Sequence, residues 1–162
     1  MLSSIRFVWI LVVCATVTCA LSRSLSQTQK LSAYDVLEEY GFPVGLLPKG
    51  AIGYALNRET GEFAVYFEET CTFDIESYKL KYKSTVTGVI SKGRLYNLKG
   101  VTVKVLVLWL NIIEVTVRGD DLEFSVGIAS ANFGIDNFYE SPQCGCGFDC
   151  NKLSLNGDVS SI

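Results

Sequence analysis

The chain of 162 residues contains no histidine. This absence excludes Ser-His-Asp and Cys-His catalytic arrangements, general acid–base catalysis by imidazole and most hydrolytic zinc sites. The sequence also lacks a phosphate-binding loop, a G-x-G-x-x-G motif and an N-x-S/T sequon. An enzyme built from this chain would have to rely on carboxylates, lysine, tyrosine or a bound cofactor. We identify no catalytic, cofactor-binding or metal-binding residues in it.

Positive charge is also scarce, because 14 Lys and Arg residues face 17 Asp and Glu residues and the formal net charge is −3. An acidic domain is a poor candidate for binding nucleic acid, so we expect no such partner. Lys79, Lys81 and Lys83 alternate along one segment. This spacing predicts the solvated face of a strand, with a site for a small anionic headgroup as the alternative.

The N-terminal residues follow the three-part pattern of a secretory signal peptide. Arg6 precedes an apolar run from Phe7 to Val17, and the small residues before position 21 suit signal peptidase. The run is shorter than the ~20 residues of a membrane span. We therefore predict a signal peptide over residues 1–20, cleaved after Ala20, and secretion of the protein; an uncleaved N-terminal anchor is the alternative.

The rest of the chain divides into one domain and two polar ends. Residues 21–31 are polar and are expected to be flexible, residues 32–150 to form a single globular domain, and residues 151–162 to form a flexible tail. The C-terminus carries neither a retention signal nor a hydrophobic anchor. We expect a monomer without a membrane span.

Four cysteines remain after the predicted cleavage: Cys71, Cys144, Cys146 and Cys150. In an oxidising compartment they indicate two disulfides, for which three connectivities exist. A bond between Cys144 and Cys146 would close a very small, strained ring. We therefore favour one bridge from Cys71 to the C-terminal cluster and one within it. A zinc site or a redox dithiol is the weaker alternative, because the spacing C-x-C-x3-C contains no C-x-x-C.

One short helix of about 8 to 10 residues is predicted after Ser32. The Ser32 side chain can cap it, Asp35 supports the free amides of its first turn, and Gly41 ends it. Tyr34, Leu37 and Tyr40 fall at helical spacing and predict its apolar face.

The pattern after residue 50 has a period of two, which is typical of strands. Residues 51–69 predict a hairpin, and residues 77–90 a long strand bent near Gly88, with Tyr78, Leu80 and Tyr82 on the face opposite the lysines. Residues 101–117 form the longest apolar run of the predicted mature chain. From Leu106 to Ile113 both faces are apolar, which predicts a strand covered on both sides.

These elements predict an α+β fold that is mostly β. The short N-terminal helix packs against, or is wrapped by, a strongly twisted antiparallel sheet, as in a partial barrel. A flat sandwich with the helix outside is the alternative.

The sequence resembles a plant family named only as domain of unknown function 538. The resemblance rests on AYDVLEEYGFPVGLLPKGAIGYALNRETGEFAVYF, SYKLKYKSTVTGVISKGRL, GVTVKVLVLWLNIIEV and LEFSVGIASANFGIDNFYESPQCGCGFDC, and covers residues 33 to 150. It implies a plant protein, which would be secreted to the apoplast, with a sheet-rich fold that has been likened to the lipid-binding modules of bactericidal/permeability-increasing proteins. Roles in stress response and in binding or hydrolysing chlorophyll are implied, without assigned catalytic residues.

Three functions remain open from the sequence. The first is a binding module for a small apolar or amphiphilic ligand such as a lipid or pigment, although an ordinary core would give the same pattern. The second is a cell-wall interaction module without a pocket. The third is a hydrolase using Glu68–Glu69 or Asp120–Asp121, which is disfavoured because adjacent strand residues point to opposite faces. The candidate pocket-lining residues are Tyr34, Leu37, Leu46, Leu47, Leu106, Leu108 and Trp109.

Overall fold

A single antiparallel sheet dominates the computed structural model, which describes residues 31–75, 77–148 and 150. The predicted signal peptide (1–20), residues 21–30 of the predicted flexible segment and the predicted tail (151–162) lie outside the described residues. The sheet is formed by β1 (Ala51–Leu56), β2 (Glu62–Phe67), β3 (Cys71–Ile75), β4 (Tyr78–Ser91), β5 (Arg94–Val105), β6 (Leu108–Asn111), β7 (Glu114–Arg118), β8 (Asp121–Ser125) and β9 (Ser130–Gly134). The remaining elements are helix α2 (Ala33–Glu39) and the 3-10 turns η2 (Val44–Leu46) and η3 (Ile135–Phe138).

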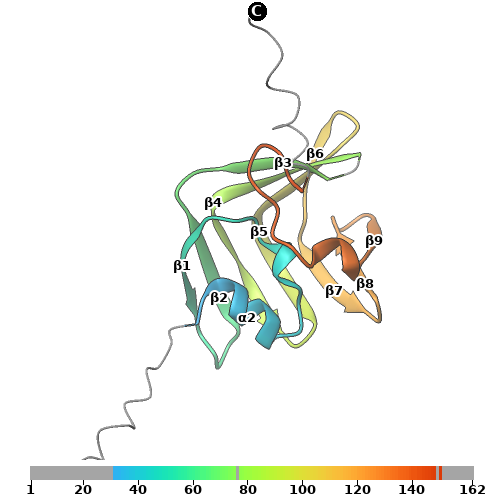
Figure 1. Cartoon of the computed structure of the whole chain (residues 1–162). Coiled ribbons are helices and arrows are strands. Elements are labelled where there is room, and N and C mark those ends of the chain that lie inside the picture. Colours follow the sequence, from blue (N-terminus) through green and yellow to red (C-terminus); the bar gives the residue numbers. More distant parts are fainter. Residues whose placement is uncertain (1–30, 76, 149, 151–162) are drawn as a thin grey trace, which may run out of the picture. The chain divides into compact units, whose positions relative to one another are not determined.

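The long β4–β5 hairpin is the centre of the sheet (Figure 1). The first half of β4 pairs with β3 and the second half with β2, while β5 pairs with β7 at its start and with β6 at its end. The register between β4 and β5 shifts between Tyr82 and Val89. Gly100 faces this irregularity with a φ of 94°, and a Cβ there would lie 2.4 Å from the Thr85 carbonyl oxygen. The predicted bend near Gly88 is therefore confirmed, with a second glycine enabling it.

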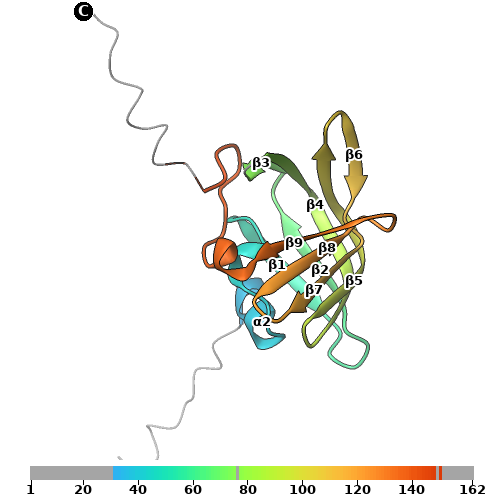
Figure 2. The same cartoon turned by 90° about the vertical axis from the view of Figure 1, so that its right-hand side faces the viewer.

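The predicted fold class is confirmed, because the sheet is twisted, curls without closing and has α2 against one face (Figure 2). Its order is β1-β2-β4-β5-β7-β8-β9, with β3 and β6 attached to the central hairpin. The core combines Ala33 and Leu37 of α2 with Val86 of β4, Leu95 of β5 and Leu122 of β8. Leu56 of β1 and Phe133 of β9, at opposite ends of the sheet order, also pack against this core, as in a partial barrel rather than a flat sandwich.

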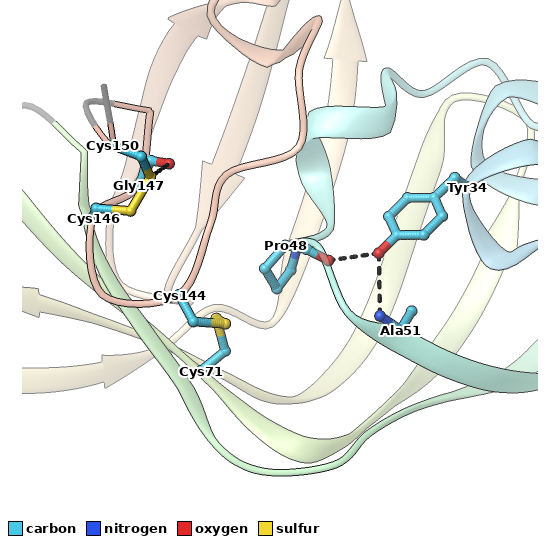
Figure 3. The surroundings of a disulfide bond; sticks show 8 residues. All are labelled: Tyr34, Pro48, Ala51, Cys71, Cys144, Cys146, Gly147 and Cys150. Atoms are coloured by element: carbon cyan, nitrogen blue, oxygen red, sulfur yellow. Dashed lines mark hydrogen bonds between the residues drawn. A yellow bond between two sulfur atoms is a disulfide. The ribbon is translucent and has the colours of Figure 1, made fainter. Parts of the chain in front are cut away.

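Helix α2 begins as the sequence predicted, with a capping box in which the Ser32 hydroxyl accepts from the Asp35 amide and the Asp35 carboxylate accepts from the Ser32 amide. Hydrogen bonding to Ser32 lowers the pKa of Asp35. The helix has 7 residues, fewer than predicted, and buries Ala33, Val36 and Leu37. Tyr34, predicted on the apolar face, is partly buried and packs against the core. Its hydroxyl donates to the Pro48 carbonyl (2.8 Å) and accepts from the Ala51 amide (3.2 Å), which ties the helix to β1 (Figure 3).

The prediction of one strand with two covered faces over residues 106–113 is wrong. Strand β5 ends at Val105, Leu106 and Val107 form a two-residue turn, and β6 returns along β5 with Leu108 opposite Val105. Leu106 has a φ of 55° and Val107 is not among the residues with positive φ. A positive φ at the first turn residue alone is the requirement of a type II′ hairpin turn, which matches strand twist and favours glycine there. The continuous apolar pattern concealed this turn because it contains no turn residue.

One disulfide ties the C-terminal segment to the sheet and a second lies within that segment, so all four candidate cysteines take part (Figure 3). Cys71 bonds to Cys144 across 73 residues of sequence, and Cys146 bonds to Cys150. This is the favoured arrangement of one bridge to the cluster and one within it. The interleaved glycines allow the close approach: the Gly145 amide donates to the Thr72 carbonyl (2.7 Å), and a Cβ on Gly147 would lie 2.4 Å from the Asp74 carbonyl oxygen. Both glycines have positive φ.

Removing the long-range bridge should destabilise the domain strongly. Replacing Cys71 and Cys144 together by Ala is expected to lower the free energy of unfolding by about 4 kcal/mol, because the bridge restricts a long loop of the unfolded chain. The Cys146–Cys150 bridge closes a loop with a sequence separation of only 4. The double substitution Cys146→Ala/Cys150→Ala should therefore lower the free energy of unfolding by only about 2 kcal/mol. Urea denaturation of both variants measures the difference. An equal or larger loss for the second pair would contradict this ranking.

Leu106→Gly should leave the domain at least as stable as the parent. Glycine at this position removes the cost of a left-handed backbone, which is about 1–2 kcal/mol for a residue with a Cβ. It also loses more conformational entropy on folding, which opposes this gain by about 0.5–1 kcal/mol. The free energy of unfolding is therefore expected to stay unchanged or rise by up to about 1 kcal/mol. Leu108→Gly, at the start of β6, is the matched control, and its free energy of unfolding should fall by about 1 kcal/mol. Thermal denaturation distinguishes the two, and equal losses would show that the turn is not strained.

Candidate functional site

An apolar cavity of about 240 Å³ lies on the inner face of the sheet, between the β3–β6 region and β8–β9. Strands β3 and β4 line it with alternating side chains of one face, including Tyr78, Leu80 and Tyr82 as the sequence predicted for that face. The described residues of the lining are Gly45, Phe73, Ile75, Tyr78, Leu80, Tyr82, Val103, Val105, Leu110, Ile112, Phe124, Val126, Ala129, Ser130, Ala131, Phe133 and Phe138. None of these described residues is charged, so this part of the cavity favours uncharged chemical groups.

Tyr82 forms the inner end of the cavity. Its ring is buried and stacks on Phe73 with centroids 5.8 Å apart, and its hydroxyl donates to the Leu46 carbonyl (2.9 Å). Burial raises the pKa of Tyr82, so the phenol stays neutral and keeps this hydrogen bond. The bond holds η2 against the sheet. At Gly45, next to it, a Cβ would lie 2.3 Å from the Phe138 carbonyl oxygen, so only glycine lets η2 and η3 meet at the cavity wall.

A cluster of aromatic rings forms the wall opposite β4. Phe133 of β9 meets Tyr78 and Phe124 edge-on, with centroids 5.7 and 5.6 Å apart. Phe124 in turn stacks on Phe138 at 5.6 Å. Edge-to-face and offset contacts of this kind hold rings in defined orientations. The cavity therefore has firm apolar walls built from strands and η3.

The mouth of the cavity lies where its lining becomes exposed. Val105 at the end of β5 is at one side, and Ala129, Ser130 and Ala131 at the start of β9 are at the other. Apart from Tyr82, Tyr78 contributes a side-chain hydroxyl to the described lining, whereas the Ser130 side chain hydrogen-bonds to the Glu123 carboxylate. A molecule that enters here meets hydrophobic surface inside and the Tyr78 hydroxyl on the wall. The described lining can therefore bind an apolar molecule, but it holds no carboxylate, amine or imidazole for acid–base chemistry.

The seven predicted pocket residues do not meet in one place. Leu37, Leu46 and Leu47 line a second, smaller cavity of about 50 Å³ between α2 and the sheet, which is little larger than one water molecule's share of liquid volume, about 30 Å³. Tyr34 holds the loop before β1, as described above. Leu106, Leu108 and Trp109 lie at the β5–β6 hairpin and line neither of these cavities.

The residues that do line the larger cavity were not identified as a set from the sequence. The face of β4 was predicted correctly, but Phe133 and Ala131 reach the cavity only because β9 folds back along β8. Their spacing in the sequence contains no sign of this contact. The alternation in residues 130–134 was too short to show which face is covered.

The candidate catalytic and metal-binding groups lie elsewhere or are used otherwise. Glu68 and Glu69 follow β2, and Asp120 and Asp121 are at the β7–β8 turn; none of them lines either cavity. The four cysteines form disulfides, so they provide no thiolates. Within residues 31–75, 77–148 and 150, no cluster of three or more His, Cys, Asp or Glu side chains is placed to hold a metal ion. No helix in the described part of the chain is long and apolar enough to cross a membrane.

Comparison with known proteins places these features in a family. An uncharacterized protein of Arabidopsis thaliana is 30% identical over 95 residues, which are 58% of this chain and 55% of the relative. The chain therefore spans about half the length of that relative. The family described as "Protein of unknown function, DUF538" matches residues 33–139, from the start of α2 to the residue after η3. This match extends over more than half of the chain and over all nine strands, and the protein belongs to the DUF538 family.

Proposed function

We propose that this protein is a non-enzymatic binding module for a small, uncharged apolar or amphiphilic molecule such as a lipid or pigment. The molecule occupies the 240 Å³ cavity between β4 and β8–β9. The observation that carries the proposal is the combination of volume and lining. A buried apolar cavity of about 150 Å³ is sufficient to bind benzene, and this one is larger and opens to the surface.

A ligand in this cavity would gain from the burial of apolar surface. Apolar surface removed from water contributes about 25 cal/mol per Å², and Phe73, Phe133 and Phe138 provide such surface in the lining. The Tyr78 hydroxyl offers a hydrogen bond to a polar end of an amphiphile.

The two disulfides support a place for this function outside the cytosol. Disulfides persist in oxidising compartments, and a small domain in such a compartment often depends on them. Together with the predicted signal peptide, they support secretion to the extracellular space. A bound amphiphile would there be shielded from water by the sheet.

Blocking the mouth should abolish binding of an apolar probe. Ala131→Phe places a ring at the mouth and is expected to weaken binding of N-phenyl-1-naphthylamine at least tenfold, because the ring competes for the cavity. Fluorescence titration of the probe measures the dissociation constant. Native mass spectrometry of protein purified without detergent tests in parallel for a copurified molecule.

Asn132→Phe is the matched control, since Asn132 lies between Ala131 and Phe133 in β9 but does not line the cavity. It adds the same ring on the other face and should leave probe affinity unchanged. Equal affinities of the two variants, or a parent protein that fails to bind the probe, would refute binding in this cavity.

A further inference from the structure

The tip of the β5–β6 hairpin, defined here as residues 105–109, exposes a continuous apolar surface. Leu106 is 91% exposed, Val107 82% and Leu108 63%, and Val105 and Trp109 are also exposed. Both views show this hairpin projecting from the end of the sheet opposite α2 (Figures 1 and 2). Large apolar side chains are seldom exposed side by side on a protein that acts alone in water, and such patches mark contact sites.

Leucine at the tip does not serve the turn itself. The positive φ of Leu106 would suit glycine, and a leucine there is strained. The Leu106 side chain is 91% exposed, so it does not fill a space in the core. The hairpin thus carries a large apolar group where the local backbone favours having none, which indicates a partner for that group.

Lysines gather on the outer face of the same region. Lys79, Lys81 and Lys83 of β4 alternate with the cavity-lining residues and so point away from the cavity. Lys104 of β5 lies opposite both Lys79 and Trp109, and the Lys81 Nζ lies 4.2 Å from the centre of the Trp109 ring. The basic side chains therefore reach directly to the apolar tip.

The charge of this region opposes that of the whole protein. The sequence segments 71–83, 101–105 and 108–111 hold four lysines, one aspartate and one glutamate, two net positive charges, in a chain of net charge −3. The aspartate, Asp74, pairs with Lys79 at 3.0 Å. The other three lysines form no ion pair among the described residues. This local excess complements an anionic surface.

We propose that the tip and these lysines dock the protein on a bilayer that contains anionic phospholipids. Leu106, Val107 and Leu108 insert between the headgroups, the Trp109 ring lies at the interface, and the lysines contact lipid phosphates. Shallow apolar insertion and a basic cluster each bind a membrane only weakly when alone. Stable membrane attachment needs two such signals together.

The docked orientation brings the cavity mouth to the membrane. Val105 belongs both to the tip and to the cavity lining, and Ile128, in the β8–β9 turn on the other side of the mouth, is 92% exposed. If the proposed function also holds, an amphiphile can pass between the bilayer and the cavity without crossing water. Docking itself does not require the cavity to bind anything.

Vesicle flotation of the purified protein tests the proposal. Vesicles with equal parts of phosphatidylcholine and phosphatidylglycerol should bind the protein, and pure phosphatidylcholine should bind it at least tenfold less. Leu106→Gly/Val107→Ser is expected to lower the partition coefficient at least tenfold while the protein stays folded. Lys81→Gln/Lys104→Gln should lower it about tenfold and weaken its dependence on salt.

Matched controls separate the tip from general surface effects. Ile52→Ser removes an exposed apolar side chain from β1, and Lys49→Gln removes an exposed lysine from the loop before it; both should bind like the parent. In the predicted mature chain 21–162, which lacks Trp9, Trp109 is the one tryptophan, and lipids with brominated acyl chains should quench its fluorescence.

Three results would overturn docking by the tip, and a fourth would overturn the part of the proposal that concerns the lysines. The first is a parent protein that floats with neither vesicle. The second is tip variants that bind as well as Ile52→Ser. The third is a concentration-dependent dimer, seen by sedimentation, that the Leu106→Gly/Val107→Ser change dissociates, because the tip would then be covered by a second copy of the chain. Equal binding to both vesicles would refute the role of the lysines.

Discussion

The bend in the β4–β5 hairpin is the constraint on which the rest of the structure depends. Two strands of 14 and 12 residues are too long to stay flat, since twist accumulates along a sheet. The register shift facing Gly100 turns the hairpin there, where an added Cβ would collide with the Thr85 carbonyl. One half of the hairpin then pairs with β2 and β7, and the other with β3 and β6.

The inner faces of the two halves of the β4–β5 hairpin are packed differently. Around the half that carries β2 and β7, α2 and the leucines before β1 fill the inner face and leave only a 50 Å³ gap. Around the half that carries β3 and β6, no helix of the described residues covers the inner face, and β8–β9 with η3 closes it incompletely. The result is a larger cavity with aromatic walls. The Cys71–Cys144 bridge holds the C-terminal segment on β3, so the edge beside this cavity is covered and braced.

The cavity, the apolar tip and the lysines are consequences of one hairpin. Successive residues of β4 and β5 point to opposite faces, so the same strands present Tyr78 and Leu80 inward and lysines outward. The β5–β6 turn lies beyond these residues at the end of the sheet. An apolar cavity, an exposed hydrophobic edge and a basic face therefore meet within a few residues. The proposed exchange of an amphiphile with a membrane would use all three features.

Local interactions explain what could be predicted from the sequence alone. The Ser32–Asp35 capping box, the period of two along β4 and the cysteine pairing with one bridge to the cluster depend on residues close in sequence or on a count of thiols. The fold class follows from the same patterns. The sequence also located the lysine face, because a strand's alternation needs no knowledge of its neighbours.

Only the tertiary structure decided where the cavity lies and what lines it. Leu106 stands where a turn residue would be expected, so the apolar run 101–117 resembled one buried strand, and only pairing of β6 with β5 shows the hairpin. Phe133 and Tyr78 are 55 positions apart and meet because β9 folds back across the sheet. The physical reason is that hydrophobic burial is non-directional: a sequence shows which side chains avoid water, whereas the strand order determines which of them share a cavity and which remain exposed.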